Sequence, residues 1–154
     1  MNDFKTDLEV GQTAEFILAS MLIMNGITGV TFNTSTSIEQ LKKYDIMYYN
    51  VNASQPVLIE VKNDLRAEYT GYFAIEAKYK GNDSGILKTT ANYWAILSDD
   101  KFYIISTKEL KTLIDSNIYR CIEVNNGTTF IHLVKVIDVA TNGIVISAKD
   151  YINN

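Results

Sequence analysis

The stretch Pro56-Val57-Leu58-Ile59-Glu60-Val61-Lys62 combines a strongly apolar strand with two charges. The valines and isoleucine favour a β-strand, and a proline is tolerated where a strand opens. Since strand side chains alternate, Glu60 and Lys62 share one face and Ile59 and Val61 the other. A charge in such a strand is costly unless it is paired or bound to a metal. We therefore expect Glu60 and Lys62 to have a charged partner or a bound metal that offsets this cost.

A second strand is expected just upstream. Residues 44–50 are rich in aromatics, and the Asn, Ala and Ser of residues 51–55 indicate a turn. The two strands predict an antiparallel hairpin. A turn centred near Ala53 puts a residue near position 46 opposite Glu60, and so brings Asp45 beside Glu60 and Lys62 within about one residue of register. Two carboxylates and one ammonium would then converge.

The rest of the chain alternates helical and strand patterns. Apolar residues at helical spacing predict an opening helix from about 6 to 25, which Gly26 ends. Further strands are expected at 72–77, 93–97, 102–106, near 130–136 and at 144–147, with a helix or turn within 84–92 and a helix from an N-cap at Thr107 to about Ile114. This order predicts an α/β or α+β fold with a central sheet.

Size, charge and cysteine content narrow the class of protein. A chain of 154 residues with 47% hydrophobic content suits one domain. Cys121 is the single cysteine, and no secretory signal or membrane-spanning apolar run is found, so we expect a soluble protein of a reducing cytoplasm. The net charge of −4 argues mildly against nucleic acid. A bound cation would weaken that objection, because it inverts the local field of the carboxylates.

The expected cluster suits phosphodiester hydrolysis. Two carboxylates can hold Mg²⁺, which keeps several waters and contacts a phosphate oxygen, while a lysine orients or deprotonates the attacking water. The ordinary alternative is a solvated strand face with a cross-strand ion pair, worth about 0.2–1 kcal/mol.

Tyr44-Asp45 followed by Glu60-Val61-Lys62 resembles the motif of the PD-(D/E)XK nuclease superfamily, an Asp at a strand end and Glu-x-Lys on the neighbouring strand. The segment Gly11-Gln12-Thr13-Ala14-Glu15 resembles the first core helix of that family, which often carries a Glu near the metal. The order of helix, three strands, helix and strand is also similar to the family core. Tyr44 replaces the proline of the motif.

Two downstream segments strengthen the likeness to small phage and bacterial members. They are Thr70-Gly71-Tyr72-Phe73-Ala74-Ile75-Glu76 and Ser84-Gly85-Ile86-Leu87-Lys88-Thr89-Thr90-Ala91. Asn92 stands where those relatives often have an acidic residue. The matching pieces lie within about residues 8–106 and leave the C-terminal third unmatched.

The resemblance implies one restriction-endonuclease-like domain over residues 1–154, similar to Holliday-junction resolvase-type cores, with a central mixed sheet flanked by helices. It implies a Mg²⁺- or Mn²⁺-dependent endonuclease in the cytoplasm of a bacterial or phage-infected cell. DNA is the implied substrate, and we expect a homodimer and no membrane partner. The implied metal ligands are Asp45, Glu60 and Val61, Lys62 would position the attacking water, and Glu15 would assist.

Alternatives to this hypothesis remain open at this point. A catalytically inactive protein of the same fold could act as a protein-binding or phage accessory module. Ser84, Lys88 and Thr89 could bind phosphate or simply form a cap and turn. We expect His132 to be structural and the tyrosines to serve packing, and Glu76 has a weaker case as a ligand than Glu15.

Overall fold

The computed structural model describes residues 4–34, 43–50, 52–116 and 120–152 as a mixed α+β fold with two sheets. The first sheet has the strand order β1 (Thr31–Phe32), β2 (Ile46–Tyr48), β3 (Val57–Asn63), β6 (Tyr93–Ser98), β7 (Lys101–Ser106), β10 (Ile144–Ser147). The second has the order β5 (Asn82–Asp83), β4 (Tyr72–Tyr79), β9 (Thr129–Lys135), β8 (Cys121–Val124). The helices are α1 (Phe4–Met24), α3 (Ala67–Thr70), the 3₁₀ turn η1 (Gly85–Leu87), α4 (Thr107–Asp115), α5 (Val136–Asn142) and α6 (Lys149–Ile152).

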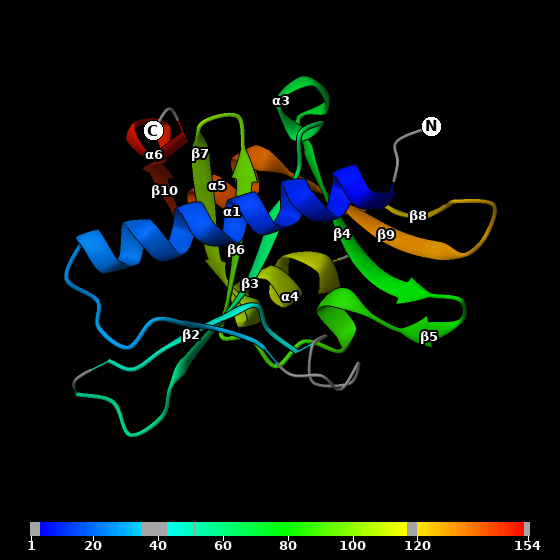
Figure 1. The fold of residues 1–154 in the computed structure, drawn as a ribbon. Helices are drawn as coiled ribbons and strands as arrows, with labels where there is room; N and C mark the ends of the chain where they lie inside the picture. The colour runs from blue at the N-terminus through cyan, green and yellow to red at the C-terminus, as the bar shows by residue number, and fades with distance from the viewer. Residues whose placement is uncertain (1–3, 35–42, 51, 117–119, 153–154) are drawn as a thin grey trace.

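The first sheet is central and mixed. Strands β1, β2 and β3 pair antiparallel in chain order, and β6 then joins β3 in parallel. Helix α1 lies across one face of this sheet (Figure 1). Its buried residues pack on inward-facing residues of β2, β3 and β6 to form a first core, which includes Ala14, Ile17, Leu18, Met21, Ile46, Ile59, Val61, Ala95 and Leu97.

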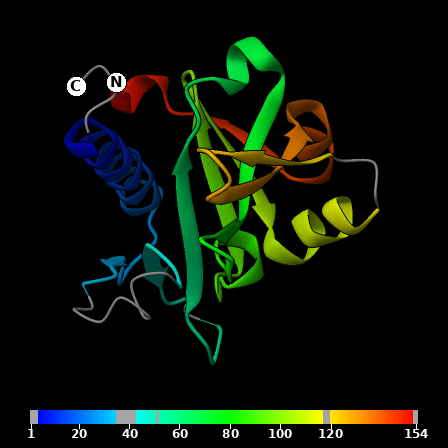
Figure 2. The same ribbon diagram turned by 90° about the vertical axis from the view of Figure 1, so that its right-hand side faces the viewer.

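The opposite face of the central sheet is covered by the second sheet with α4 and α5. In the side view, α1 lies on one side of the central sheet and α4 on the other (Figure 2). The side chains of β6 alternate between the two faces, because successive strand residues point in opposite directions. Trp94 and Ile96 thus belong to a second core, with Phe73, Ile75, Ile105, Leu110, Val134 and Val139.

The expected hairpin forms, with a register one residue from the predicted one. Ile46 pairs with Ile59, whereas a residue near position 46 was expected opposite Glu60. Continuing the observed register puts Asp45 opposite Glu60. The predicted strand at residues 44–50 is shorter than expected, because only Ile46–Tyr48 belong to β2.

Three expectations about other elements need correction. The strand expected at 72–77 forms as β4, but it pairs with β9, and the short β1 supplies the third strand of the central sheet. The N-cap of α4 is Ser106, whose side chain accepts a hydrogen bond from the Glu109 N–H. The strand expected to reach Val136 ends at Lys135, where α5 begins.

The opening helix ends as predicted, since Gly26 follows it with a φ of +82°. Within the described part of the chain, no helix is both long and apolar enough to span a membrane.

Candidate active site

Glu60 and Lys62 lie side by side on the face of β3 that is turned away from α1. Ile59 and Val61 enter the first core, so alternation sends the two charged residues to the other face. Lys62 Nζ is 2.6 Å from Glu60 Oε1 and 5.8 Å from the centroid of the Trp94 ring. The Glu60 side chain is only 9% exposed, whereas that of Lys62 is 44% exposed. A buried carboxylate is therefore paired with a lysine whose side chain is partly exposed.

Asp45 precedes β2 and is bound directly to β3. Its backbone N–H donates to the Ile59 carbonyl at 2.9 Å, and its Oδ2 accepts the Val61 N–H at 2.7 Å. The hairpin therefore brings Asp45 to the Glu60–Lys62 segment, as the sequence predicts. Lys43, two residues earlier, is held in turn by the Thr89 hydroxyl, which donates to its carbonyl at 3.1 Å.

Among the described residues, no strand pairs with the β2 side of β3 beyond Ile59. The ladder between β2 and β3 runs only from Val57 to Ile59, so Asp45 Oδ2 takes the place of a strand partner at Val61. The N–H and C=O of one strand residue point to the same edge. The Val61 carbonyl therefore faces the edge at which the Asp45 carboxylate lies.

The surroundings of Asp45 destabilise the charged form of its carboxylate. Burial, with the charge of Glu60, raises the pKa of Asp45 from an ordinary 3.8 to about 7. Lys62 and the Val61 N–H oppose this rise. A group with a pKa near 7 is about half protonated at neutral pH. A cation placed between Asp45 and Glu60 would relieve their repulsion.

Lys62 stays charged in this setting. Burial alone would lower the pKa of Lys62. The charges of Glu60 and Asp45 outweigh that effect, so the pKa of Lys62 lies above its ordinary value. The side chain is consequently an ammonium at neutral pH, able to donate hydrogen bonds but unable to accept a proton.

Glu15 reaches the same electrostatic environment from α1. Its side chain is half-buried, and burial raises the pKa of Glu15. The charge of Lys62 lowers this pKa and that of Glu60 raises it, so Glu15 interacts electrostatically with both residues. The helix expected to flank the cluster does so.

Glu76 and Trp94 are parts of this site to which the sequence gave little weight. The charge of Glu76, on β4, also raises the pKa of Lys62. Trp94 pairs with Glu60 in the parallel ladder and lies under the Lys62 ammonium. The Thr-Gly-x-x-x-Ile-Glu segment was a signal for Glu76, but the sequence did not show which strand β4 would approach.

The donor set suits one hard cation better than a cage of carboxylates. Across the described residues, no group of three or more His, Cys, Asp or Glu side chains is arranged to hold a metal ion. Mg²⁺, however, is commonly bound through one or two carboxylates while keeping several waters. Asp45 and Glu60 supply two carboxylates, and the Val61 carbonyl faces the edge at which the Asp45 carboxylate lies.

Ser84 and Asn92, two of the remaining candidates, have hydrogen-bond partners within the fold. The Ser84 hydroxyl donates to Glu76 Oε1, and η1 has only three residues, too few to offer a helix N-terminus to phosphate. Asn92 Oδ1 accepts the Leu58 N–H at 2.8 Å, which fixes the start of β3. His132 lies in β9, and burial lowers its pKa against the opposing charge of Asp115, so the imidazole is neutral at pH 7.

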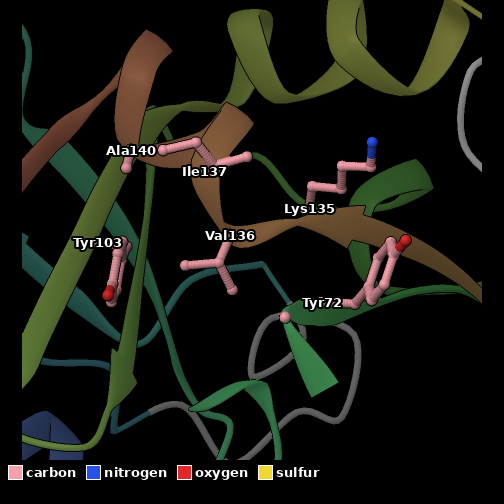
Figure 3. Close-up of a pocket in the computed structure, with 7 residues that line it drawn as sticks. Tyr72, Tyr103, Lys135, Val136, Ile137 and Ala140 are labelled. Carbon is pink, nitrogen blue, oxygen red and sulfur yellow. The ribbon is translucent and has the colours of Figure 1, made fainter. Parts of the chain in front are cut away.

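A separate hollow of about 440 Å³ is lined by residues of β4, β7, β9 and α5 and by Gly71. Figure 3 shows Tyr103 of β7 on one side of it, Val136 and Ile137 in the middle, and Lys135 with Tyr72 on the other side. Its lining is mostly apolar and includes none of the charged residues at the β3 edge. The hollow is therefore a different site from the cluster of Asp45, Glu60 and Lys62.

No protein-family model matches the chain, and no curated protein matches it.

Proposed function

We propose that the protein is a divalent-metal-dependent nuclease that hydrolyses DNA phosphodiester bonds. The observation that carries the proposal is the meeting of three groups at the edge of β3. Asp45 Oδ2 lies 2.7 Å from the Val61 N–H, and Lys62 Nζ lies 2.6 Å from Glu60 Oε1. Two carboxylates and an ammonium in this arrangement suit phosphoryl chemistry, in which catalysis is mostly positioning and charge stabilisation.

The resemblance to the PD-(D/E)XK superfamily supports the same function. Part of its order of helix, three strands, helix and strand has a counterpart in α1, β1, β2, β3 and β6, whereas α3, β4, β5 and the 3₁₀ turn η1 lie between β3 and β6 in place of one helix. Its Asp and Glu-x-Lys correspond to Asp45 and Glu60-Val61-Lys62, which are neighbours in space. The preference for DNA over RNA rests on this family analogy.

Each residue of the site would have a distinct task. Asp45, Glu60 and the Val61 carbonyl would hold Mg²⁺ or Mn²⁺, which supplies charge stabilisation at the phosphate and acidifies a bound water. Lys62, as a permanent ammonium, would orient the attacking water or a phosphate oxygen rather than remove a proton. Glu15 would hold a water on the α1 side of the site.

The decisive experiment is a cleavage assay on linear, supercoiled and branched DNA and on RNA, with Mg²⁺ or Mn²⁺. We expect wild type to cut DNA, and Glu60→Gln to reduce the rate by about 10²–10³, as loss of a charge-stabilising group does. Glu68→Gln is the matched control, because Glu68 is an exposed carboxylate in α3. Equal rates for Glu60→Gln and Glu68→Gln would contradict the proposal.

Replacing Lys62 should abolish most cleavage but leave metal binding intact. We expect Lys62→Gln to bind Mn²⁺ in calorimetry like the exposed-lysine control Lys108→Gln, yet to lose most cleavage. Parallel loss of both properties would make Lys62 a structural residue. A wild-type protein that neither binds Mn²⁺ nor cuts would instead favour a protein-binding or phage accessory module.

A further inference from the structure

The outer edge of β10 is less protected than the other sheet edges of the described residues. The two sheets end in β1, β5, β8 and β10. An unpaired row of N–H and C=O groups can pair with another strand, and proteins protect such edges with charges, prolines or very short strands. Strands β1 and β5 have two residues each, and β8 carries the exposed Glu123. The four residues of β10, Ile144-Val145-Ile146-Ser147, include no charge and no proline.

The backbone groups at this edge belong to Val145 and Ser147. The Ala148 N–H donates to the Asp100 carbonyl at 2.7 Å, so these residues form a hydrogen-bonded pair at the end of the ladder between β7 and β10. Hydrogen-bonded and non-hydrogen-bonded pairs alternate in an antiparallel ladder, so Ile146 also bonds to β7. Val145 and Ser147, on either side of Ile146, therefore direct their N–H and C=O groups away from β7.

This edge is accessible to a partner. Ile144 is 64% exposed and Val145 is 41% exposed. The helices on either side of β10 lie on opposite faces of the central sheet, because Val139 of α5 belongs to the second core and Tyr151 of α6 packs against the first. Figure 1 shows β10 beside β7, with α6 at its end. A second strand can thus add to β10 without displacing either core.

We propose that β10 pairs with β10 of a second copy of this chain, antiparallel about a two-fold axis through Ile146, and so joins two central sheets in a homodimer. In this register Val145 stands opposite the partner's Ser147 and exchanges both N–H···O=C bonds with it, once on each side of the axis. A register shifted by two residues would set one outward-facing residue of each strand opposite a residue beyond β10. The strand therefore complements a copy of itself, as a two-fold interface requires.

The apolar surface beside β10 would complete the interface. A stable dimer buries about 800 Å² per partner, more than a four-residue strand supplies. Val145 stands opposite Tyr103 in the ladder with β7, so both side chains lie on the face that carries the hollow, where Ile137 is 66% exposed. On the other face, Ile144 would stand opposite the partner's Ala148, a large residue against a small one. Contacts on both faces would thus extend the interface beyond the paired backbones.

Sedimentation equilibrium over a range of protein concentrations tests the dimer. We expect the mean mass of wild type to rise from that of one chain towards twice that value. Val145→Pro removes an outward N–H without breaking a bond to β7, and Val145→Lys places two like charges in the interface. Each variant, folded by circular dichroism, should raise the dissociation constant about tenfold or more.

Glu123→Pro in β8 is the matched control. Its N–H also points to a free edge, because the Leu133 N–H donates to the Arg120 carbonyl at 3.2 Å and the bonded residues of β8 alternate from there. This variant should dissociate like wild type. Unchanged dissociation constants in both Val145 variants would overturn the proposal. A wild type that stays monomeric would also overturn it, and would point to a strand of another protein as the occupant.

A disulfide tests the register. In a Cys121→Ser background, which removes the single cysteine, we expect Ile146→Cys to oxidise to a linked dimer. The two copies of residue 146 would form a non-hydrogen-bonded pair with Cα atoms about 4.5 Å apart, within disulfide range. Ile144→Cys is the control, because this more exposed position faces the partner's Ala148 and should cross-link much more slowly. Faster cross-linking through Ile144→Cys would overturn the two-fold axis at Ile146.

Discussion

At the scale of single residues, Asp45 carries the clearest conflict between stability and the proposed function. Its carboxylate is half-buried beside Glu60, and burial with that charge raises its pKa from 3.8 to about 7. The folded state therefore binds this proton more tightly than the unfolded chain does. The resulting stabilisation is fully present at pH below the unfolded pKa and is lost as the pH rises through the folded pKa.

The neutral variant Asp45→Asn should not lose stability as the pH rises through the pKa of Asp45. Its amide oxygen can still accept the Val61 N–H, but it cannot ionise. We expect its advantage in free energy of unfolding over wild type to grow between about pH 4 and pH 7, to about 1–2 kcal/mol after allowance for solvent screening, and cleavage to disappear. Urea denaturation at several pH values measures this. The control Asp83→Asn, at an exposed position in β5, should follow the wild-type pH dependence; a constant offset for Asp45→Asn would contradict the raised pKa.

The sequence could predict the residues at the hairpin but not their neighbours from β4. Asp45, Glu60 and Lys62 follow from strand alternation and one short turn, so local rules are sufficient. The approach of Glu76 to Lys62 depends on where β4 turns after α3, and that is set by its pairing with β9, more than fifty residues later in the chain. No local pattern specifies a partner at that distance.

At the scale of elements, the contact between η1 and β4 has one sensitive position. Gly85 has a φ of +46°, and an added Cβ would meet the Glu76 backbone. We expect Gly85→Ala to reduce the free energy of unfolding by the strain of a positive φ, about 1–2 kcal/mol, plus roughly 1–3 kcal/mol of overpacking. Urea denaturation followed by circular dichroism measures both contributions together.

Gly81→Ala isolates the backbone contribution. Gly81 has a φ of +78° but nothing within 4 Å of an added Cβ. The Gly81→Ala variant should therefore lose only about 1–2 kcal/mol in free energy of unfolding, through backbone strain. Equal losses in the two alanine variants would show that η1 can move away from β4.

The elements differed in how far local patterns could specify them. The strand at 144–147 and the strand from Val57 were predicted at nearly their observed bounds, because their apolar residues are β-branched and bounded by turns. Helix α5 was missed. Its sequence, Val136-Ile137-Asp138-Val139-Ala140-Thr141-Asn142, continues an apolar strand with β-branched residues, and no side chain caps its start. Packing of Val139 in the second core favours the helix instead.

At the scale of the whole molecule, two cores share the central sheet. Adjacent residues of β6 supply opposite cores, Ala95 the first and Trp94 the second. Neither core can therefore lose its packing without disturbing the strand that both use. Unfolding should be a single cooperative process.

A matched pair of leucine variants tests this coupling. Leu18 in the first core and Leu110 in the second are both completely buried. We expect Leu18→Ala and Leu110→Ala each to cost about 2–5 kcal/mol and to move one common transition in calorimetry. Separate transitions, with each variant affecting only one, would show two independent folding units.

The placement of Trp94 gives the chain a built-in optical reporter. It is the single tryptophan, it is fully buried, and the ammonium of Lys62 lies 5.8 Å from its ring centroid. Indole emission responds to nearby charge, so any event that displaces this ammonium changes the fluorescence of one known residue. Occupancy of the site can thus be followed in unlabelled protein, before a substrate has been found.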